Sequence, residues 1–61
     1  MTNQERMKRV RASTGLSQAA FSKWLGIPKR TIENWETGSR EPSDYIVRLI
    51  EYFVHHELET N

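Results

Sequence analysis

Apolar residues recur at helical spacing in four separate stretches of the chain. Glycine and proline separate these stretches at Gly15, at residues 26–28, at Gly38 and at Pro42. Both residue types mark helix ends, because glycine readily adopts the left-handed conformation and proline lacks a backbone N–H. No stretch shows the period of two that predicts a strand. The pattern predicts an all-α fold of four helices, with room for a short fifth, in a single domain over residues 1–61.

The first two helices have capping signals at their starts. Thr2 and Glu5 stand three residues apart, as a capping box requires, which predicts a helix from about Asn3 to Thr14. Ser17 is a favourable N-cap for a second helix that ends at Gly26. The apolar residues expected to face inward are Met7, Val10, Ala20, Phe21 and Leu25.

The third helix follows the second after only about three residues. Pro28 suits its first turn, where a missing N–H costs nothing, and Gly38 ends it. Ile32 and Trp35, three residues apart, are expected to face inward. Two short helices joined so closely through a glycine predict a helix-turn-helix over about residues 17–37.

The fourth helix follows Pro42, with Ser43 as its expected cap, and we expect the chain to fray after Leu58. About two-thirds of its circumference is apolar, which is more than a surface helix usually shows. We assign the core face to Tyr45, Ile46, Leu49, Ile50 and Phe53. The apolar surface that this core face does not use predicts a homodimer contact formed by Val47, Tyr52, Val54 and Leu58. The alternative is that this excess wraps the small core of one monomer.

The length and composition exclude several classes of protein. A chain of 61 residues has no room for separate substrate and cofactor domains, and no catalytic constellation is present, so we expect neither an enzyme nor a cofactor. His55 and His56 are adjacent and point about 100° apart on a helix, which argues against a metal site. No apolar run reaches membrane-spanning length and the start does not resemble a signal peptide, so we expect a cytoplasmic protein with no membrane contact.

The charge is divided unevenly between the two ends of the chain. Residues 1–40 contain eight Lys and Arg against three Glu, a net charge of +5, whereas residues 41–61 carry −4. This division favours an anionic partner for the first part and a different surface for the second. Two solvated helix faces of opposite sign would give the same pattern.

Many spaced positions resemble a known family. These positions are Arg11, Gly15-Leu16-Ser17-Gln18, Leu25-Gly26-Ile27, Thr31-Ile32, Trp35-Glu36, Gly38 and Pro42. Their pattern resembles the phage-repressor or Cro-like helix-turn-helix family, also called the xenobiotic-response-element (XRE) type. The match covers roughly residues 7 to 53. The resemblance implies a lambda-repressor-like domain that binds duplex DNA with its third helix in the major groove. Most members add a fifth helix; its absence here strengthens our expectation of a homodimer.

Specific residues receive roles from this resemblance. It implies a phosphate contact for Gln18, base-edge contacts for Lys29, Arg30 and Asn34, and an internal ion pair between Arg11 and Glu36.

The chemistry of the residues agrees with these roles. Arginine can donate two parallel hydrogen bonds to guanine and asparagine pairs with adenine, while Thr31 can contact a thymine methyl group. Ser17 lies at a helix N-terminus, which favours phosphate. Thr37, Ser39 and Arg40 follow the third helix, where we expect further phosphate contacts. The alternative is an ordinary solvated helix face.

These observations predict a sequence-specific transcriptional regulator of bacterial or phage type, which represses by occupying an operator in double-stranded DNA. A second hypothesis belongs to a different class. The domain would be a protein-interaction module, such as the antitoxin of a toxin–antitoxin pair, whose DNA binding is autoregulatory. The acidic fourth helix would then dock a basic toxin or other partner.

Overall fold

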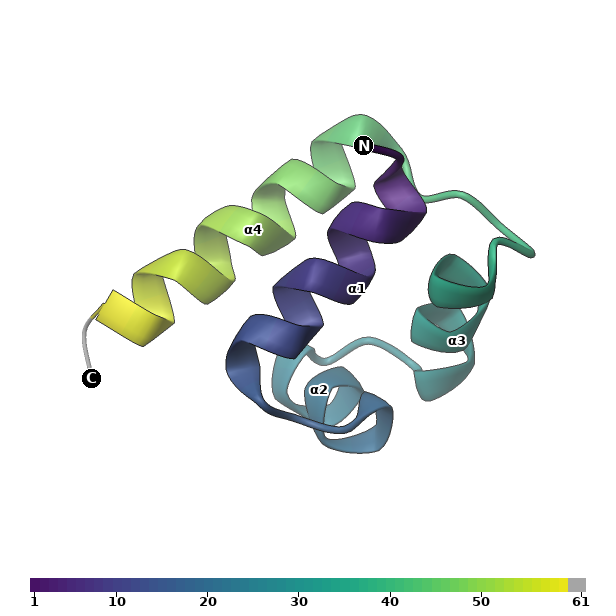
Figure 1. Ribbon diagram of the computed structural model, residues 1–61. Helices are drawn as coiled ribbons and strands as arrows, with labels where there is room; N and C mark the ends of the chain where they lie inside the picture. The colour runs from purple at the N-terminus through teal and green to yellow at the C-terminus, as the bar shows by residue number, and fades with distance from the viewer. Residues whose placement is uncertain (60–61) are drawn as a thin grey trace.

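The computed structural model describes residues 1–59 and contains four helices in that range. They are α1 (Asn3–Thr14), α2 (Gln18–Leu25), α3 (Lys29–Thr37) and α4 (Asp44–Glu59). α2 and α3 lie together on one side of α1, while α4 packs along α1 and its C-terminal half projects away from α3 (Figure 1). The predicted all-α, four-helix architecture is confirmed. No helix within residues 1–59 has both the length and the apolar composition needed to cross a bilayer.

The predicted caps of α1 and α2 are present. The Thr2 hydroxyl accepts from the Glu5 N–H at 3.1 Å, and a Glu5 carboxylate oxygen accepts from the Thr2 N–H at 2.9 Å. These hydrogen bonds to the charged form hold the pKa of Glu5 below its usual value. Ser17 Oγ accepts from the Ala20 N–H at 3.1 Å and starts α2.

The structure corrects details at three helix ends. Pro28 is the N-cap of α3 rather than a residue of its first turn, and it contributes its carbonyl oxygen to the N–H groups of Thr31 and Ile32. Ser43 precedes α4, but its hydroxyl is buried without a hydrogen-bond partner in the described part of the chain. Glu59 is still helical, and the rest of the tail expected to fray, residues 60–61, lies outside the described residues.

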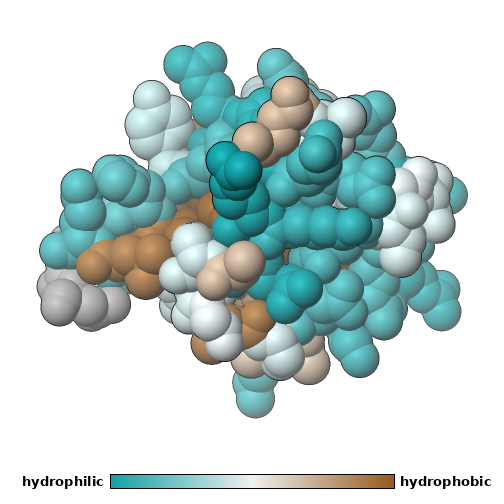
Figure 2. All heavy atoms as spheres, viewed as in Figure 1, coloured by the Kyte–Doolittle hydropathy of each residue, from teal (hydrophilic) through white to brown (hydrophobic). Residues whose placement is uncertain are grey.

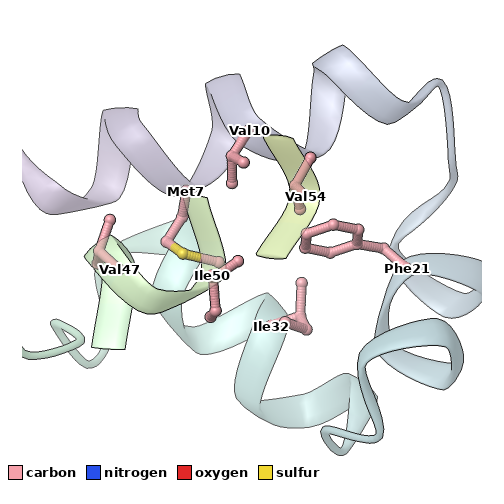
Figure 3. Close-up of a cluster of buried hydrophobic side chains, with 7 residues drawn as sticks. All are labelled: Met7, Val10, Phe21, Ile32, Val47, Ile50 and Val54. Atoms are coloured by element: carbon pink, nitrogen blue, oxygen red, sulfur yellow. The ribbon is translucent and has the colours of Figure 1, made fainter. Parts of the chain in front are cut away.

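The hydrophobic core receives side chains from all four helices. Phe21 from α2 and Ile32 from α3 lie close together and point towards the buried side chains of α1 and α4 (Figure 3). Because each short helix buries only two or three residues, no helix can satisfy its apolar face alone. The seven buried core residues are Met7, Val10, Phe21, Ile32, Val47, Ile50 and Val54.

The structure corrects the predicted faces of α4. Val47 and Val54, which we assigned to a dimer contact, are 0% and 2% exposed in the monomer core and are not available to a second chain. Tyr45, Leu49 and Phe53, which we assigned to the core, are instead exposed. Tyr52 and Leu58, the other two predicted dimer residues, lie on the surface.

The physical reason is that two apolar stripes on α4 have equivalent spacing. Val47, Ile50 and Val54 repeat at intervals of three and four residues, and so does the stripe that was expected to be buried. The two stripes share Ile50 and are rotated by about 100° around the helix, so the period alone cannot choose between them. Branched side chains such as Val47 and Val54 are short enough for α4 to pack closely against Met7 and Val10 of α1.

Polar contacts also hold α1 and α4 together, beside the apolar residues of their interface. Arg6 Nη2 donates to Glu51 at 2.6 Å and its Nη1 donates to Asp44 at 3.2 Å. The hydrogen bond to Glu51 is the main cause of a raised pKa for Arg6. Asn3 Nδ2 also donates to the Pro42 carbonyl at 3.1 Å, which holds the start of α1 against the segment that enters α4.

Trp24 connects α2 to α4 through aromatic contacts. Its ring centroid lies 6.2 Å from that of Phe21 and 5.1 Å from that of Phe53, in tilted arrangements. Such pairs add about 0.5–1.5 kcal/mol beyond simple burial. Trp24 therefore covers the edge of the core, although its side chain remains partly exposed.

We predict that Val47→Ala lowers the free energy of unfolding by about 1–2 kcal/mol, because it opens a cavity at a fully buried site. Leu49→Ala, two residues further along the same helix, is the matched control and should change stability by less than about 0.5 kcal/mol. Urea unfolding followed by circular dichroism measures both. A larger loss for Leu49→Ala than for Val47→Ala would contradict the observed orientation of α4.

Candidate nucleic-acid interface

The turn between α2 and α3 sets the relative orientation of these helices. Gly26 has φ of 76°, and its N–H contacts the carbonyl oxygens of Lys23 and Ser22 at the end of α2. A Cβ built at Gly26 would meet no atom within 4 Å, so glycine is needed for its backbone conformation rather than for space. The Ile27 N–H donates to the Ser22 carbonyl at 2.9 Å, and the Ile27 side chain packs against the core.

The inner face of α3 is held by two apolar residues and one ionic residue. Ile32 is fully buried, Trp35 is partly buried against the core, and Glu36 is only 4% exposed. These three positions lie on one side of the helix, because residues three and four apart share a face. The remaining positions of α3 therefore point away from the core.

The outer face of α3 carries the predicted base-reading residues. Lys29 and Arg30 are exposed at the first turn, while Thr31 and Asn34 are half-buried at its edge. Arg30 and Asn34 are four residues apart, so their side chains lie one above the other. Within residues 1–59, no hydrogen bond or ion pair engages the side chains of Lys29, Arg30 and Asn34, and all three remain available to a ligand.

A buried ion pair fixes α3 against α1. Arg11 Nε donates to Glu36 Oε2 at 2.7 Å and Nη2 donates to Oε1 at 2.9 Å, in a bidentate arrangement. The hydrogen bond to Glu36 raises the pKa of Arg11. Arg11 Nη1 also donates to the Leu16 carbonyl at 3.0 Å, which orients the segment leading into α2. This is the ion pair that the sequence resemblance implies.

Two glutamines join the same network. Gln18 Nε2 donates to Glu36 Oε1 at 3.1 Å, so the first residue of α2 contacts α3 directly. Gln4 Nε2 donates to the Glu36 backbone carbonyl at 2.8 Å, which connects the start of α1 to the end of α3. Gln4 carries no signal in the sequence that would have identified this role. Glu36 is thus the point at which α1, α2 and α3 meet.

The start of α2 presents backbone donors beside α3. Ser17 uses its hydroxyl oxygen to cap Ala20. The N–H groups of the first turn of a helix have no partner within the helix and carry partial positive charge. Gln18 is half-buried, and one of the two N–H groups of its side-chain amide donates to Glu36, which leaves the second N–H as a donor for a ligand.

The segment after α3 is shaped by a second local network. Gly38 has φ of 87°, and the N–H groups of Gly38 and Arg40 both donate to the Asn34 carbonyl. The hydroxyls of Thr37 and Ser39 lie 3.1 Å apart. Both hydroxyls are exposed, as is the Arg40 side chain, so the three predicted phosphate contacts are available at the last residue of α3 and in the segment that follows it.

Comparison with known proteins identifies the family. A family model described as helix-turn-helix matches residues 7–51, which is most of the chain. The chain belongs to the XRE-type, Cro/C1-like helix-turn-helix family. Searches of curated proteins and of solved structures found no match.

Family membership makes this helix-turn-helix protein a DNA-binding regulator of the XRE type, in a family that is typically non-enzymatic. The matched residues include α2, the turn, α3 and both partners of the Arg11–Glu36 ion pair. The match ends inside α4, before the exposed C-terminal part of that helix.

We predict that Arg11→Met lowers the free energy of unfolding of this helix-turn-helix domain by about 3 kcal/mol, because it leaves the Glu36 carboxylate buried without its cation. Arg9→Met is the matched control, since Arg9 is exposed on the same helix and should change stability by less than about 0.5 kcal/mol. Urea unfolding at low temperature measures the difference. Equal effects of the two substitutions would contradict a structural role for the ion pair.

Proposed function

We propose that this protein is a sequence-specific transcriptional repressor that reads the major groove of double-stranded DNA with α3. The main support for this proposal is the outer face of α3. It presents two cations and an amide with no internal partners, on a helix whose inner face is held by a buried ion pair. A rigid helix with free base-reading groups is the arrangement that major-groove recognition requires.

The proposed base contacts follow from the donors and acceptors of each side chain. Arg30 donates two parallel hydrogen bonds to O6 and N7 of guanine, and Asn34 pairs with N6 and N7 of adenine. Lys29 reaches a neighbouring guanine edge, and Thr31 places its methyl group against thymine. Because Arg30 and Asn34 are one helical turn apart, they contact neighbouring base pairs rather than the same one.

The proposed phosphate contacts lie on both sides of α3. Ser17 and Gln18 approach one phosphate from the N-terminus of α2, where backbone N–H groups and partial positive charge favour an anion. Thr37, Ser39 and Arg40 approach another phosphate beyond the end of α3. These contacts position the domain without reading sequence, and neutralisation of phosphates makes the binding weaken steeply with salt.

We further propose that the protein acts as a homodimer in the cytoplasm of a bacterial or phage-infected cell. Two copies related by a two-fold axis would present their α3 helices to successive major grooves, about 34 Å apart. The longest dimension of the described chain is 33 Å, which is compatible with one protomer per half-site.

A second candidate function is a protein-interaction module whose DNA binding is autoregulatory, such as an antitoxin. Its support is the apolar surface on α4, where Tyr45 and Leu49 are 67% and 63% exposed. Large exposed apolar patches often mark protein contacts. Co-purification of a small basic partner from the native host would favour this function over a free-standing repressor.

We predict that Arg30→Ala weakens binding to a preferred operator by about 1–3 kcal/mol and relaxes the preference at one base pair. Arg40→Ala should weaken binding to all duplexes by a similar factor, because a phosphate contact carries no sequence information. Selection of bound duplexes from a random pool, followed by competition titrations with both variants, measures the two effects.

Arg9→Ala provides the control, because it removes the same charge from an exposed position on α1, away from α3. It should preserve the sequence preference. An unchanged preference in Arg30→Ala, with affinity lost equally for every duplex, would show that Arg30 does not read a base.

A further inference from the structure

The segment between α3 and α4 is exposed along most of its length. Residues 38–41 are all exposed, and Pro42 is the first buried residue after α3. Figure 2 shows a largely hydrophilic surface on the side of α3 and this segment, in contrast to the band of hydrophobic residues along the C-terminal part of α4. A short exposed segment samples many conformations unless polar contacts hold it. The predicted phosphate contacts of Ser39 and Arg40 therefore depend on support from elsewhere in the fold.

The first turn of α1 supports one end of this segment through Gln4. Gln4 Nε2 donates to the Glu36 carbonyl at 2.8 Å, in the last turn of α3. A Cβ built at Gly38 would lie 3.1 Å from Gln4 Oε1, so the Gln4 amide lies directly against the glycine at which the chain leaves α3. The N–H groups of Gly38 and Arg40 share the Asn34 carbonyl. A contact at Gly38 therefore also restricts the backbone of Arg40.

The neighbouring residue, Asn3, supports the other end of the segment. Asn3 Nδ2 donates to the Pro42 carbonyl at 3.1 Å. Asn3 Oδ1 in turn accepts from Arg6 Nη1 at 3.2 Å, and Arg6 is held by its ion pairs with α4. Because Asn3 and Gln4 are adjacent, one turn of α1 contacts the chain on both sides of residues 39–41.

Two adjacent residues of the segment carry opposite charges, so its conformation determines how it meets DNA. Arg40 attracts a phosphate and Glu41 repels one, and both side chains are exposed. Neither forms an ion pair within residues 1–59. A segment free to reorient would present either charge, and the attraction and the repulsion would largely cancel. A fixed backbone lets the domain present Arg40 to the phosphate in preference to Glu41.

We propose that Asn3 and Gln4 are positioning residues for DNA binding, which hold the segment after α3 so that Ser39 and Arg40 meet a phosphate. This inference rests on the proposed function and adds the first turn of α1 to the parts of the protein that determine affinity. Neither Asn3 nor Gln4 carries a charge, and neither needs to touch DNA in this role. Because base reading belongs to α3, removal of their contacts should weaken binding without changing the preferred sequence.

The test is the salt dependence of binding to the selected duplex. A cation that contacts a phosphate releases counterions, so Arg40→Ala should lower the slope of log Kd against log salt concentration by about one. Gln4→Ala removes no charge, yet it should raise the Kd about threefold to tenfold and lower the same slope by about 0.5–1, because Arg40 no longer holds its phosphate. Asn3→Ala releases the other end of the segment and should act in the same direction.

A double variant separates positioning from a general loss of stability. In Gln4→Ala/Arg40→Ala, the Kd should lie within about twofold of that of Arg40→Ala alone, because the cation that Gln4 positions is already absent. A loss of folded protein would instead weaken binding by the same factor whether or not Arg40 is present, and it would leave the salt slope unchanged. Circular dichroism and urea unfolding identify a temperature at which every variant is fully folded.

Ser13→Ala is the matched control, since it also removes a polar group from α1 without changing the net charge. Ser13 is exposed, and its hydroxyl donates to the Val10 carbonyl within α1. It lines an apolar groove between α1 and the C-terminal half of α4, to which Val10, Val54 and Leu58 contribute the apolar surface. The Kd and the salt slope of Ser13→Ala should equal those of the original chain.

Three outcomes overturn this inference. They are an unchanged salt slope in both Gln4→Ala and Asn3→Ala, losses from Gln4→Ala and Arg40→Ala that multiply fully in the double variant, or a changed sequence preference in Gln4→Ala. Each of these outcomes requires the original chain to bind the duplex. An original chain that binds no duplex even at low salt would contradict the proposed function itself.

Discussion

The bidentate contact between Arg11 and the buried Glu36 is the constraint on which the arrangement of the first three helices depends. A chain of 61 residues without cysteine has few other means of fixing helix orientation, because each helix buries so little apolar surface. Since Gln18 and Gln4 also donate to Glu36, this single carboxylate and its backbone carbonyl connect α1, α2 and α3. Removal of Glu36 from water offsets much of the attraction between the two charges, whereas the bidentate geometry restricts how α3 can lie against α1.

The fold places two different kinds of surface on opposite sides of α1. The side formed by α2 and α3 presents the unpaired cations of Lys29 and Arg30 and the unpaired amide of Asn34, whereas the opposite side presents the apolar groove and the exposed stripes of α4. α4 is attached mainly by Val47, Ile50 and Val54 and by the Arg6 ion pairs, while Tyr45, Leu49 and Tyr52 stay exposed on its surface. In the proposed function, DNA recognition and association with another chain can be changed independently by substitutions on different helices.

Much of the fold was predictable because its signals are local. The caps at Thr2 and Ser17 and the glycine helix ends depend on residues only a few positions away, and the helices that they delimit are confirmed. Ile50 and Ile46 of the predicted core face of α4 are in or against the core, whereas Tyr45, Leu49 and Phe53 are exposed. The error arose because two stripes of α4 share one period, and only packing against α1 distinguishes them. The Gln4–Glu36 contact joins positions 32 residues apart, so no local pattern encodes it. Lys29, Arg30 and Asn34 were placed together by helical periodicity, while their DNA contacts remain predictions.

We infer that the ion pair between Arg11 and Glu36 holds an α3 face that meets DNA. The most direct measurement is a titration of the isotopically labelled protein with a selected duplex, followed through its backbone amide resonances. Shifts or broadening should concentrate at residues 17–19, 29–34 and 37–40, while residues 45–58 of α4 change little beyond any effect of dimerisation seen without DNA. Perturbations concentrated in α4, with α3 unchanged, would contradict the account.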